Sequence, residues 1–493
     1  MTGALNKHFV IAEDERDLAY PGADLGAGAR RTRVLDLHVA RGRDLRLYPV
    51  RRADGTEAGA VLGWLIDQEA GGLTPDGAEI AAPEAGADFR DWSMRFSGRF
   101  VCLLDLGDGP AFHTDPAGLL GAVRATGRGL IASTPALIDA PEDAELKAAF
   151  GVPERFGWFP FGLTPRAGVV RLHPNFSFNF NSLEEDRFWS APPVRENSDG
   201  EAALVSAIHR ATTVAATALA RSALNPISAH LTAGYDSRMV LAATWPERAR
   251  LVFSTIGAIP GTGADLDAAV AAIIAGRFGL AHEIRPFIES SEADRADWIA
   301  RTGGCIADHV TGLAATVRSL PPGEVQLAGI SGELARAFYW TAAEIGAEAP
   351  STETLLQRIK APARPRVFEA AEAWRATLPA MDAPRFWDMV YLEQRLGAWA
   401  GPAVYGAHQP VPSLSPFNSR EIVEAMLSLP TAYRASNRFP TDFIALSEPA
   451  LNAIPYNRPF GRAALADPTG WLKGMLPKDA KTRLKRLKAR LKG

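Results

Sequence analysis

The chain has 493 residues, of which 47% are hydrophobic and 22% are charged, and its formal net charge is -3 at pH 7. These values are typical of a globular enzyme of two or three domains, and the small net charge provides no general attraction to nucleic acid. Two distant cysteines, Cys102 and Cys305, without a Cys-x-x-Cys pair exclude a zinc ribbon. The two cysteines are expected to be buried thiols in a reducing compartment. The sequence shows neither an apolar secretion signal nor an apolar run of membrane-spanning length, so we expect a cytoplasmic protein.

Residues 1–190 carry the pattern of short strands joined by turns. Apolar and polar residues alternate at 33–39, and a longer apolar run at 96–105 predicts a buried strand. The polar, Pro-rich segment 191–200 then predicts a linker between two domains.

The second domain begins with a helical pattern over 201–224, in which large apolar residues recur among alanines. The apolar run 227–231 predicts a strand, and small residues at 232–237 separate it from a helical segment at 239–243. A strand, a small-residue turn and a helix point backbone N–H groups and a helix N-terminus at one place. This arrangement suits a phosphate or pyrophosphate group.

The turn itself carries side chains suited to phosphate and metal. Thr232 and Ser237 add hydroxyl donors, and Asp236 supplies a hard oxygen ligand for the magnesium that accompanies a nucleotide. The alternative is an ordinary strand–helix turn in which Asp236 and Ser237 cap the helix. Arg238, in the first helical turn, is either a clamp for phosphate or carboxylate or a surface arginine.

Strands and helices continue to alternate after this turn. The repeated units predict a parallel, doubly wound sheet, whose ligands bind at the carboxyl ends of the strands. Gly234, Gly257 and Gly329 all lie at such ends. The expected elements are a strand at 250–257, a helix at 265–278, a strand at 282–287, a helix at 294–318 and a strand at 324–329.

The C-terminal third is expected to be helical over 340–400, followed by a Pro- and Ser-rich loop at 406–419. The last residues, 476–493, form a basic amphipathic segment with three leucines on one face. We expect this helix either to dock through its leucines or to make weak contact with an anionic membrane surface or RNA.

The segment from Thr232 to Ser237 resembles the Ser-Gly-Gly-x-Asp-Ser pyrophosphate loop of the asparagine synthetase family, which includes lasso-peptide cyclase and β-lactam synthetase relatives. Thr232 takes the place of the first Ser and Ala233 that of the first Gly. The resemblance implies an adenine nucleotide alpha hydrolase-like synthetase domain over 201–475. It assigns ATP binding to Leu231, Thr232, Ala233, Gly234, Tyr235, Asp236, Ser237, Arg238, Thr255, Gly257, Gly329 and Ser331.

Two N-terminal segments resemble the glutaminase domain of the same family. They are the strand around Gly98-Arg99-Phe100 and the turn Asp115-Pro116-Ala117-Gly118. The resemblance implies an α+β sandwich of the N-terminal nucleophile (Ntn) type over 1–190. That family's glutaminase needs a cysteine directly after the initiator methionine, whereas this chain has Thr2. We therefore expect a retained domain without glutaminase activity.

The family's second acidic element, Gly-Glu-Gly-x-Asp-Glu, is matched here by the segment that begins at Gly329. Glu333 takes the place of the final Glu, Gly332 that of the metal-binding Asp, and Ile330 that of the upstream Glu. The resemblance makes Asp236 and Glu333 the magnesium ligands. For Glu333, the alternative is a carboxylate placed at a helix N-terminus by the helix dipole.

Two further segments depart from the family. Pro416-Phe417-Asn418-Ser419 resembles its Pro-Phe-Leu-Asp segment, with Asn-Ser in place of Leu-Asp. The family also has a lysine that stabilises charge at the adenylate, and the matching region 433–442 contains none. Arg438, or else Arg434, is expected to supply that charge, although arginine spreads it over a planar fork.

The resemblance implies an ATP-dependent, AMP-forming amide ligase that uses ATP and Mg²⁺, with Asp236, Glu333 and Arg438 as catalytic residues. It would adenylate a carboxylate and transfer it to an amine without glutamine. The expected partners are a carboxylate substrate and an amine acceptor, each a small molecule, glycan or peptide, with macrolactam formation on a peptide as one version. A partner enzyme from a biosynthetic cluster is also expected, and nucleic acid is not.

Two other functions stay open at this point. An inactive binding or scaffold protein is favoured by Gly332, Ile330 and the missing lysine, and is opposed by the intact Asp236 and Ser237. A glutamine-hydrolysing asparagine synthetase is opposed by the missing N-terminal cysteine.

Overall fold

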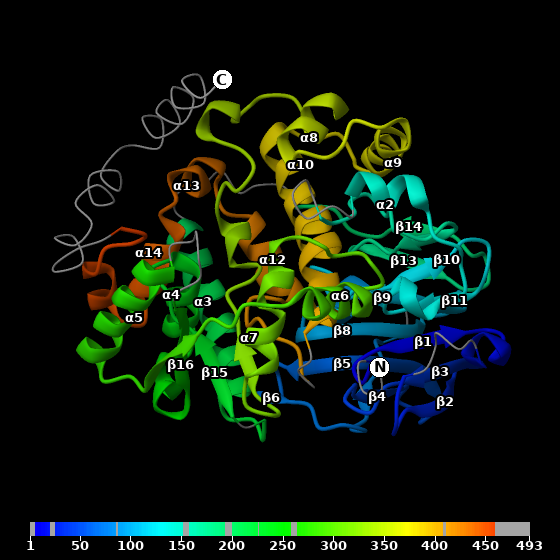
Figure 1. Ribbon diagram of the computed structural model, residues 1–493, viewed down its shortest axis with the longest axis horizontal. Helices are drawn as coiled ribbons and strands as arrows, with labels where there is room; N and C mark the ends of the chain where they lie inside the picture. The colour runs from blue at the N-terminus through cyan, green and yellow to red at the C-terminus, as the bar shows by residue number, and fades with distance from the viewer. Residues whose placement is uncertain are drawn as a thin grey trace.

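Two antiparallel sheets and one parallel sheet form the framework of the protein (Figure 1). The structure is a computed structural model that describes residues 5–19, 25–84, 87–150, 157–192, 200–224, 226–257, 264–407 and 411–458. The antiparallel sheets come from the first part of the chain and the parallel sheet from the second. An α/β class with a parallel sheet, as the sequence predicts, is thus confirmed.

The antiparallel sheets pack face to face. The first has the strand order β12-β10-β11-β1-β3-β2, with bounds Val169–Arg171, Val123–Ala125, Leu130–Ala132, Phe9–Ala12, Leu37–Arg41 and Arg30–Val34. The second has the order β14-β13-β9-β8-β5-β4-β7, with bounds Glu185–Arg187, Phe176–Asn179, Pro110–Thr114, Phe96–Asp105, Glu57–Asp67, Leu47–Arg51 and Ile80–Ala81, and β6 (Gly72–Leu73) pairs with β5. The rings of Phe9 and Phe112, one from each sheet, lie 6.2 Å apart in the shared core.

Side chains of β8 point alternately to the two faces of the second sheet, and both faces are buried. Val101 and Leu103 belong to the core between the sheets, while Cys102 and Leu104 pack on the outer face beneath α1 (Phe89–Ser93). A strand that is buried on both sides reads as a continuous apolar run, which is the pattern that predicted it. Both cysteines are free and buried, in agreement with the sequence.

The parallel sheet has the order β17-β16-β15-β18, with bounds His282–Pro286, Val252–Gly257, Ile227–His230 and Val325–Leu327. Helices α4 (Tyr235–Ala243) and α5 (Ala264–Phe278) connect the first three strands in chain order, β15, β16 and β17. The chain then returns past both strands to place β18 beside β15. Successive strands are thus added on one side of β15 up to β17, and then on its other side with β18. Open α/β sheets bind their ligands at such a reversal of strand order, here between β15 and β18.

The connection from β17 to β18 differs from the sequence prediction. Instead of one helix at 294–318, it contains α6 (Glu292–Arg301), a 3-10 turn (His309–Leu313) and α7 (Ala314–Arg318). The break lies at Gly303 and Gly304, which have φ values of 63° and 81°. A Cβ on Gly303 would lie 2.6 Å from Thr134 Oγ1, so the glycine allows this turn to pack on the antiparallel half.

The C-terminal part of the chain is helical. Its helices are α8 (Thr352–Ile359), α9 (Pro365–Ala376), α10 (Ala383–Met389), a π-helical segment (Val390–Ala400), α11 (Gly401–Gly406), α12 (Arg420–Leu427), α13 (Thr431–Ser436) and α14 (Phe439–Ala445). In Figure 1, α8, α9, α10 and α13 lie at the top of the molecule, and α12 and α14 lie below them. A Cβ on Gly401 would lie 2.1 Å from the carbonyl oxygen of Gly118. The long helical stretch 383–406 thus contacts the turn at Asp115–Gly118 directly.

One loop joins the antiparallel half to the parallel sheet. Leu414 pairs with Leu327 at the edge of the parallel sheet, and Ser419 pairs with Ser97 on β8. Between them, the Asn418 amide donates to the carbonyl oxygen of Gly98 at 2.6 Å and to Asp115 Oδ1 at 2.8 Å. Asn418 therefore has a role at the contact between the two halves.

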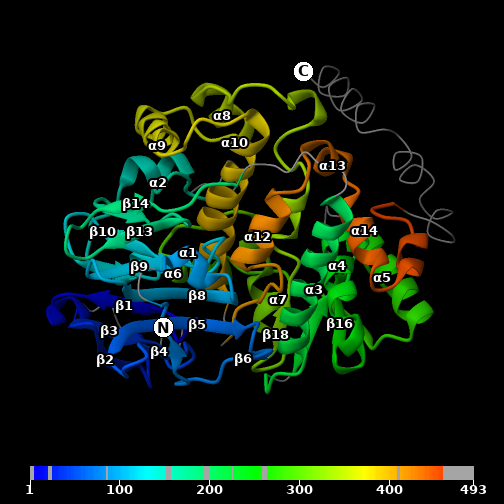
Figure 2. The same ribbon diagram turned by 180° about the vertical axis from the view of Figure 1, so that it is seen from behind.

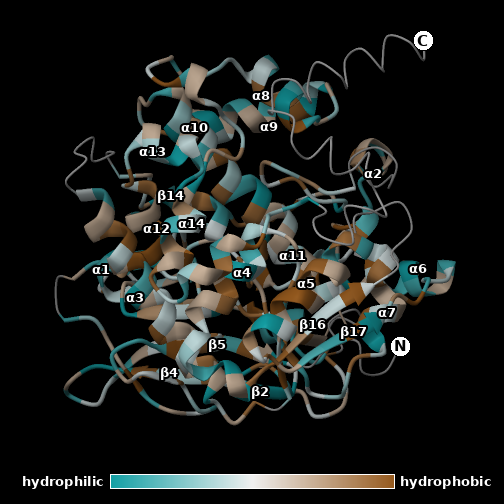
Figure 3. Cartoon of the chain, turned by 90° about the vertical axis from the view of Figure 1, so that its left-hand side faces the viewer, coloured by the Kyte–Doolittle hydropathy of each residue, from teal (hydrophilic) through white to brown (hydrophobic). Residues whose placement is uncertain are grey.

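Helix α3 (Glu201–Ala220) lies on the side of the parallel sheet that faces the viewer in Figure 2. With a mean hydropathy of 1.2, it is the one helix in the described ranges whose length and composition would allow it to cross a membrane. It packs against α4, α12 and α14 within the fold. Figure 3 views the adjoining end of the molecule, where α5 is apolar along much of its length.

Candidate active site

The fold brings Asp236 and Glu333 together at the reversal point of the parallel sheet. Asp236 lies in the first turn of α4, directly after β15, and Glu333 lies in the 3-10 turn Gly332–Ala335, directly after β18. The two carboxyl groups lie close enough for the charge of Asp236 to act on the pKa of Glu333. Burial and the charge of Asp236 raise the pKa of Glu333 to about 7, and burial raises the pKa of Asp236.

Gly329 permits this close approach. A Cβ built at this position would lie 2.8 Å from the carbonyl oxygen of Asp236 and 2.9 Å from its Cβ. Both contacts are shorter than ordinary van der Waals distances, so any other residue would push the Asp236 backbone away. The glycine that the sequence places at a strand end therefore sets the separation of β18 and α4.

Arg336 is a third member of this site, and the sequence did not single it out. Its Nη2 lies 2.9 Å from Asp236 Oδ1, and its guanidinium lies 5.9 Å from the ring centre of Tyr235. No motif signalled this residue, because its contact with Asp236 spans 100 positions of the chain.

Three buried polar atoms of the same turn have no hydrogen-bond partner among the described residues: Ser331 Oγ, Glu333 Oε2 and Arg336 Nε. Ser331 also has a φ of 78°, in the left-handed region that non-glycine residues rarely adopt. Buried polar atoms are normally paired, and residues in strained conformations cluster at functional sites. Together with the strained Ser331, these atoms leave polar groups of the turn available to a ligand.

The loop 232–237 is held by its own side chains and by one from α5. Ser237 Oγ accepts from the backbone N–H of Thr232 at 3.0 Å, and Thr232 Oγ1 accepts from that of Gly234 at 3.1 Å. Asp267, which the sequence prediction did not include, accepts from the N–H of Ala233 at 2.9 Å. A carboxylate oxygen thus occupies one anion-binding position of the loop.

Helix α4 has no side-chain cap at its N-terminus, where Gly234 is the N-cap residue. The alternative in which Asp236 and Ser237 cap this helix is therefore wrong. Asp236 contacts Arg336 and Glu333, and Ser237 contacts Thr232. The N-terminal end of α4 keeps the partial positive charge that attracts anions.

Arg238 contacts the loop through the carbonyl oxygen of Ala233, to which its Nη2 donates at 3.3 Å, and its other contacts hold it away from a clamp role. Its side chain is fully buried and donates to the carbonyl oxygens of Ile454 at 2.6 Å and Pro455 at 2.7 Å. The guanidinium also lies 4.1 Å from the ring centre of Tyr456, which stacks on Tyr235 at 4.2 Å. These contacts make Arg238 a positioning residue that ties the segment 449–458 to the loop.

The cation at the site also differs from the prediction. Arg438, expected as a catalytic residue, is 59% exposed and pairs with Asp442 at 3.3 Å and Glu201 at 3.8 Å. Arg434, the other candidate, is buried and pairs with Asp388 at 2.5 Å. Arg336 supplies the positive charge next to Asp236, because tertiary packing places the other two arginines against other carboxylates.

The residues predicted at the end of β16 have mainly structural contacts. Thr255 Oγ1 donates to the carbonyl oxygen of Leu231 at 2.6 Å and contacts His282 Nε2 at 2.9 Å. Gly257 ends the strand, and a Cβ there would lie 2.9 Å from Ile284 Cγ2. The Thr255 side chain is therefore engaged within the sheet.

An aromatic cluster adjoins the acid pair. Tyr391, in the π-helical segment, lies beside Glu333, and its ring centre lies 4.4 Å from that of Phe338. Phe338 is 48% exposed. The sequence prediction did not include Tyr391, which reaches the site from an element 58 residues further along the chain.

Several predicted features lie outside the described residues. They are Thr2, most of the linker 191–200 and the whole basic tail 476–493. The first strand of the described chain, β1, begins at Phe9.

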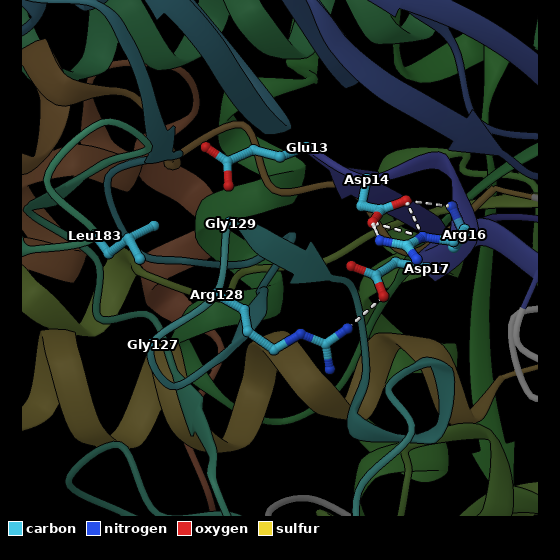
Figure 4. Close-up of a pocket in the computed structure, with 8 residues that line it drawn as sticks. All are labelled: Glu13, Asp14, Arg16, Asp17, Gly127, Arg128, Gly129 and Leu183. Carbon is cyan, nitrogen blue, oxygen red and sulfur yellow. Dashed lines mark hydrogen bonds and ion pairs between the residues drawn. The ribbon is translucent and has the colours of Figure 1, made fainter.

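A hollow of about 600 Å³ on the antiparallel half offers a contrast with this site (Figure 4). Four of its five charged side chains form two ion pairs, Asp14 with Arg16 and Asp17 with Arg128. None of the residues that line the hollow has a buried polar atom without a partner among the described residues, in contrast to the turn beside Asp236. We therefore place the candidate active site at the parallel sheet.

Comparison with known proteins leaves the family of this chain open. The chain matches no protein-family model and no curated protein. Among solved structures it is similar to glutamine phosphoribosylpyrophosphate (PRPP) amidotransferase from B. subtilis, complexed with ADP and GMP, at 10% sequence identity. That match covers 75% of this chain and 88% of the other, with a TM-score of 0.19. A likeness this weak does not establish a shared fold, so the functional proposal rests on the residues of the site.

Proposed function

We propose that this protein is an ATP-dependent, AMP-forming amide ligase that adenylates a carboxylate and transfers it to an amine without using glutamine. The observation that carries the proposal is the meeting of Asp236 and Glu333 at the reversal point of a parallel sheet, beside the uncapped N-terminus of α4. An N-terminal domain of the Ntn type and a pyrophosphate-loop synthetase domain are part of the same proposal.

The residues present fit a magnesium ion that arrives with ATP. Magnesium prefers oxygen ligands and is commonly held by one or two carboxylates together with phosphate oxygens and water. Asp236 and Glu333 supply two such carboxylates, and Glu333 Oε2 has no partner among the described residues. The described part of the chain has no group of three or more His, Cys, Asp and Glu side chains suited to a metal. Two carboxylates plus the triphosphate therefore match this ion.

The proposed reaction has two displacements. A carboxylate oxygen of the acyl substrate attacks the α-phosphorus of ATP and pyrophosphate leaves. The amine then attacks the acyl carbon, AMP leaves, and the amine nitrogen loses a proton as the amide forms. Magnesium, when bound, offsets the negative charge on the phosphate oxygens.

The chain's own residues bind and position the reactants. The hydroxyls of Thr232 and Ser237, which contact each other in the loop, and the end of α4 would bind the phosphates, while Asp236 and Glu333 would hold the metal. Tyr235 and Tyr456, stacked at 4.2 Å, pack beside the loop. Arg238 holds the segment 449–458 over it, which excludes water from the acyl-adenylate.

A catalytically inactive binding protein is the second candidate. Two observations favour it: Arg336 already pairs with Asp236, and Asp267 already accepts from the N–H of Ala233. Gly332 and Ile330 also leave the turn after β18 with Glu333 as its one carboxylate. In that case Arg336 and Asp267 would occupy the groups that a nucleotide and its metal need, and the loop would bind no nucleotide.

Calorimetric titration with Mg–ATP distinguishes the two candidates. The wild type should bind at millimolar ATP or below, and Asp236→Asn should lose this binding, because the amide keeps the shape but not the charge. Loss of a direct metal carboxylate should also slow ATP–pyrophosphate exchange by about 10³-fold, or several kcal/mol. The matched control is Asp186→Asn, on exposed β14. A wild type that does not bind Mg–ATP would refute the ligase and leave the binding protein.

A further inference from the structure

Arg336, the cation of the site, has N–H donors that its contact with Asp236 does not use. Arg336 is 19% exposed, contacts Asp236 through Nη2 at 2.9 Å, and has a buried Nε without a partner among the described residues. A guanidinium carries five N–H donors in a fixed fork, so one carboxylate contact leaves donors unused. Arginine forks match phosphate oxygens especially well.

We infer that Arg336 binds a phosphate group of the nucleotide, and that it exchanges its ion pair with Asp236 for that phosphate when Mg–ATP enters. This inference rests on the proposed function and names a ligand of the same site. It assigns to Arg336 the charge-stabilising role that the sequence prediction gave to Arg438.

The exchange follows from competition for one carboxylate. Asp236 Oδ1 accepts from Arg336 in the structure, and the same carboxylate is the leading metal ligand of the proposal. A divalent cation on Asp236 satisfies its charge and weakens its attraction for the guanidinium. The released Arg336 would then lie beside the phosphates held at the end of α4, where its fork finds new oxygen acceptors.

Other arginines near the loop have partners other than Asp236, although Arg238 Nε and Arg434 Nε and Nη2 are also buried without a partner among the described residues. Arg238 donates to backbone carbonyl groups, Arg434 pairs with Asp388, and Arg438 pairs with Asp442 and Glu201. Within the described ranges, Arg336 is the arginine whose side chain contacts Asp236. Its position after β18 keeps it next to the reversal point of the sheet, where a nucleotide would bind.

Two roles for Arg336 predict opposite changes in affinity. If Arg336 only balances the charge of Asp236, Arg336→Met removes a competitor of the metal and should strengthen Mg–ATP binding. If Arg336 binds phosphate, the same variant should weaken Mg–ATP binding by about 10- to 100-fold, as expected for hydrogen bonds to a charged group. Arg336→Lys keeps the charge and should lie between the wild type and Arg336→Met.

Inorganic pyrophosphate in the presence of EDTA tests the exchange without metal. In the wild type, Asp236 holds Arg336, so binding should be weak. Asp236→Asn frees the guanidinium and should bind metal-free pyrophosphate more tightly than the wild type, although it binds Mg–ATP less well. The double variant Asp236→Asn with Arg336→Met should lose this gain.

The control is Arg318→Met, which removes a half-exposed arginine paired with Asp294 and should leave both titrations unchanged. Thermal melting checks that each variant is folded. The inference is overturned if Arg336→Met binds Mg–ATP as tightly as the wild type or more tightly. It is also overturned if Asp236→Asn and the double variant bind pyrophosphate equally. Absence of Mg–ATP binding by the wild type would instead refute the ligase, and the pyrophosphate titrations would still decide the role of Arg336.

Discussion

Replacing Gly329 by alanine should displace Asp236 without removing any charge from the site. The new Cβ would lie 2.8 to 2.9 Å from the backbone and Cβ of Asp236, where ordinary contacts begin at 3.4 Å. One of the two segments must therefore move by about 0.5 Å, because protein interiors are close-packed. Overpacking of this kind costs about 1–3 kcal/mol of stability.

The displacement of Asp236 should also weaken ligand binding. A misplacement of about 1 Å can cost about 10²-fold in rate, so half that shift of Asp236 should reduce Mg–ATP affinity or pyrophosphate exchange about tenfold. Calorimetry with Mg–ATP and a thermal melt on the same sample measure both effects. Gly329→Ala should melt somewhat below the wild type and bind clearly less nucleotide.

Gly276→Ala is the matched control for this substitution. Gly276 is exposed in α5, and a Cβ there meets nothing within 4 Å. Alanine stabilises a helix interior by up to about 1 kcal/mol relative to glycine, so this variant should be at least as stable as the wild type and bind equally. The reasoning would be refuted if Gly329→Ala bound Mg–ATP with wild-type affinity, since Asp236 would then tolerate the added methyl group in place.

Two other predictions concern the antiparallel half. Burial, with the nearby charge of Arg420 as a smaller cause, lowers the pKa of His113 to about 3. Because unfolded His113 takes up a proton below about pH 6.5 and the folded residue does not until about pH 3, this residue should cost about 1.4 kcal/mol of unfolding free energy per pH unit over that window. Urea unfolding at pH 7 and pH 5 should therefore show a larger loss for the wild type than for His113→Leu, and equal losses would contradict the burial of a neutral imidazole. Glutamine should not be hydrolysed, because Thr2 stands where the resembled glutaminase needs cysteine; glutamate release that Thr2→Ala abolishes would show that this expectation is wrong.

The alternation of strand and helix patterns was sufficient to predict the parallel sheet. Apolar runs of strand length, each followed by a helical period, fold locally into β15, α4, β16, α5 and β17, so their order and type follow from nearby residues. Turn chemistry was equally local and placed Asp236 after β15, while Glu333, after β18, was predicted from the resemblance to the asparagine synthetase family. For one connection the local pattern was insufficient, because Gly303 and Gly304 interrupt the expected helix at 294–318 to pack against the antiparallel half.

Which side chains meet at the site was decided by the tertiary structure alone. Asp236 touches Arg336 only because the chain returns to place β18 beside β15, a neighbour relation that no local pattern records. Tertiary packing also buries Arg238, which donates to the backbone carbonyl oxygen of Ile454. It leaves Arg438 at the surface, where it pairs with Asp442. Charge and residue type limit what a side chain can bind, but the meeting of Asp236 with Arg336 depends on contacts between segments a hundred residues apart, and those are set by strand order.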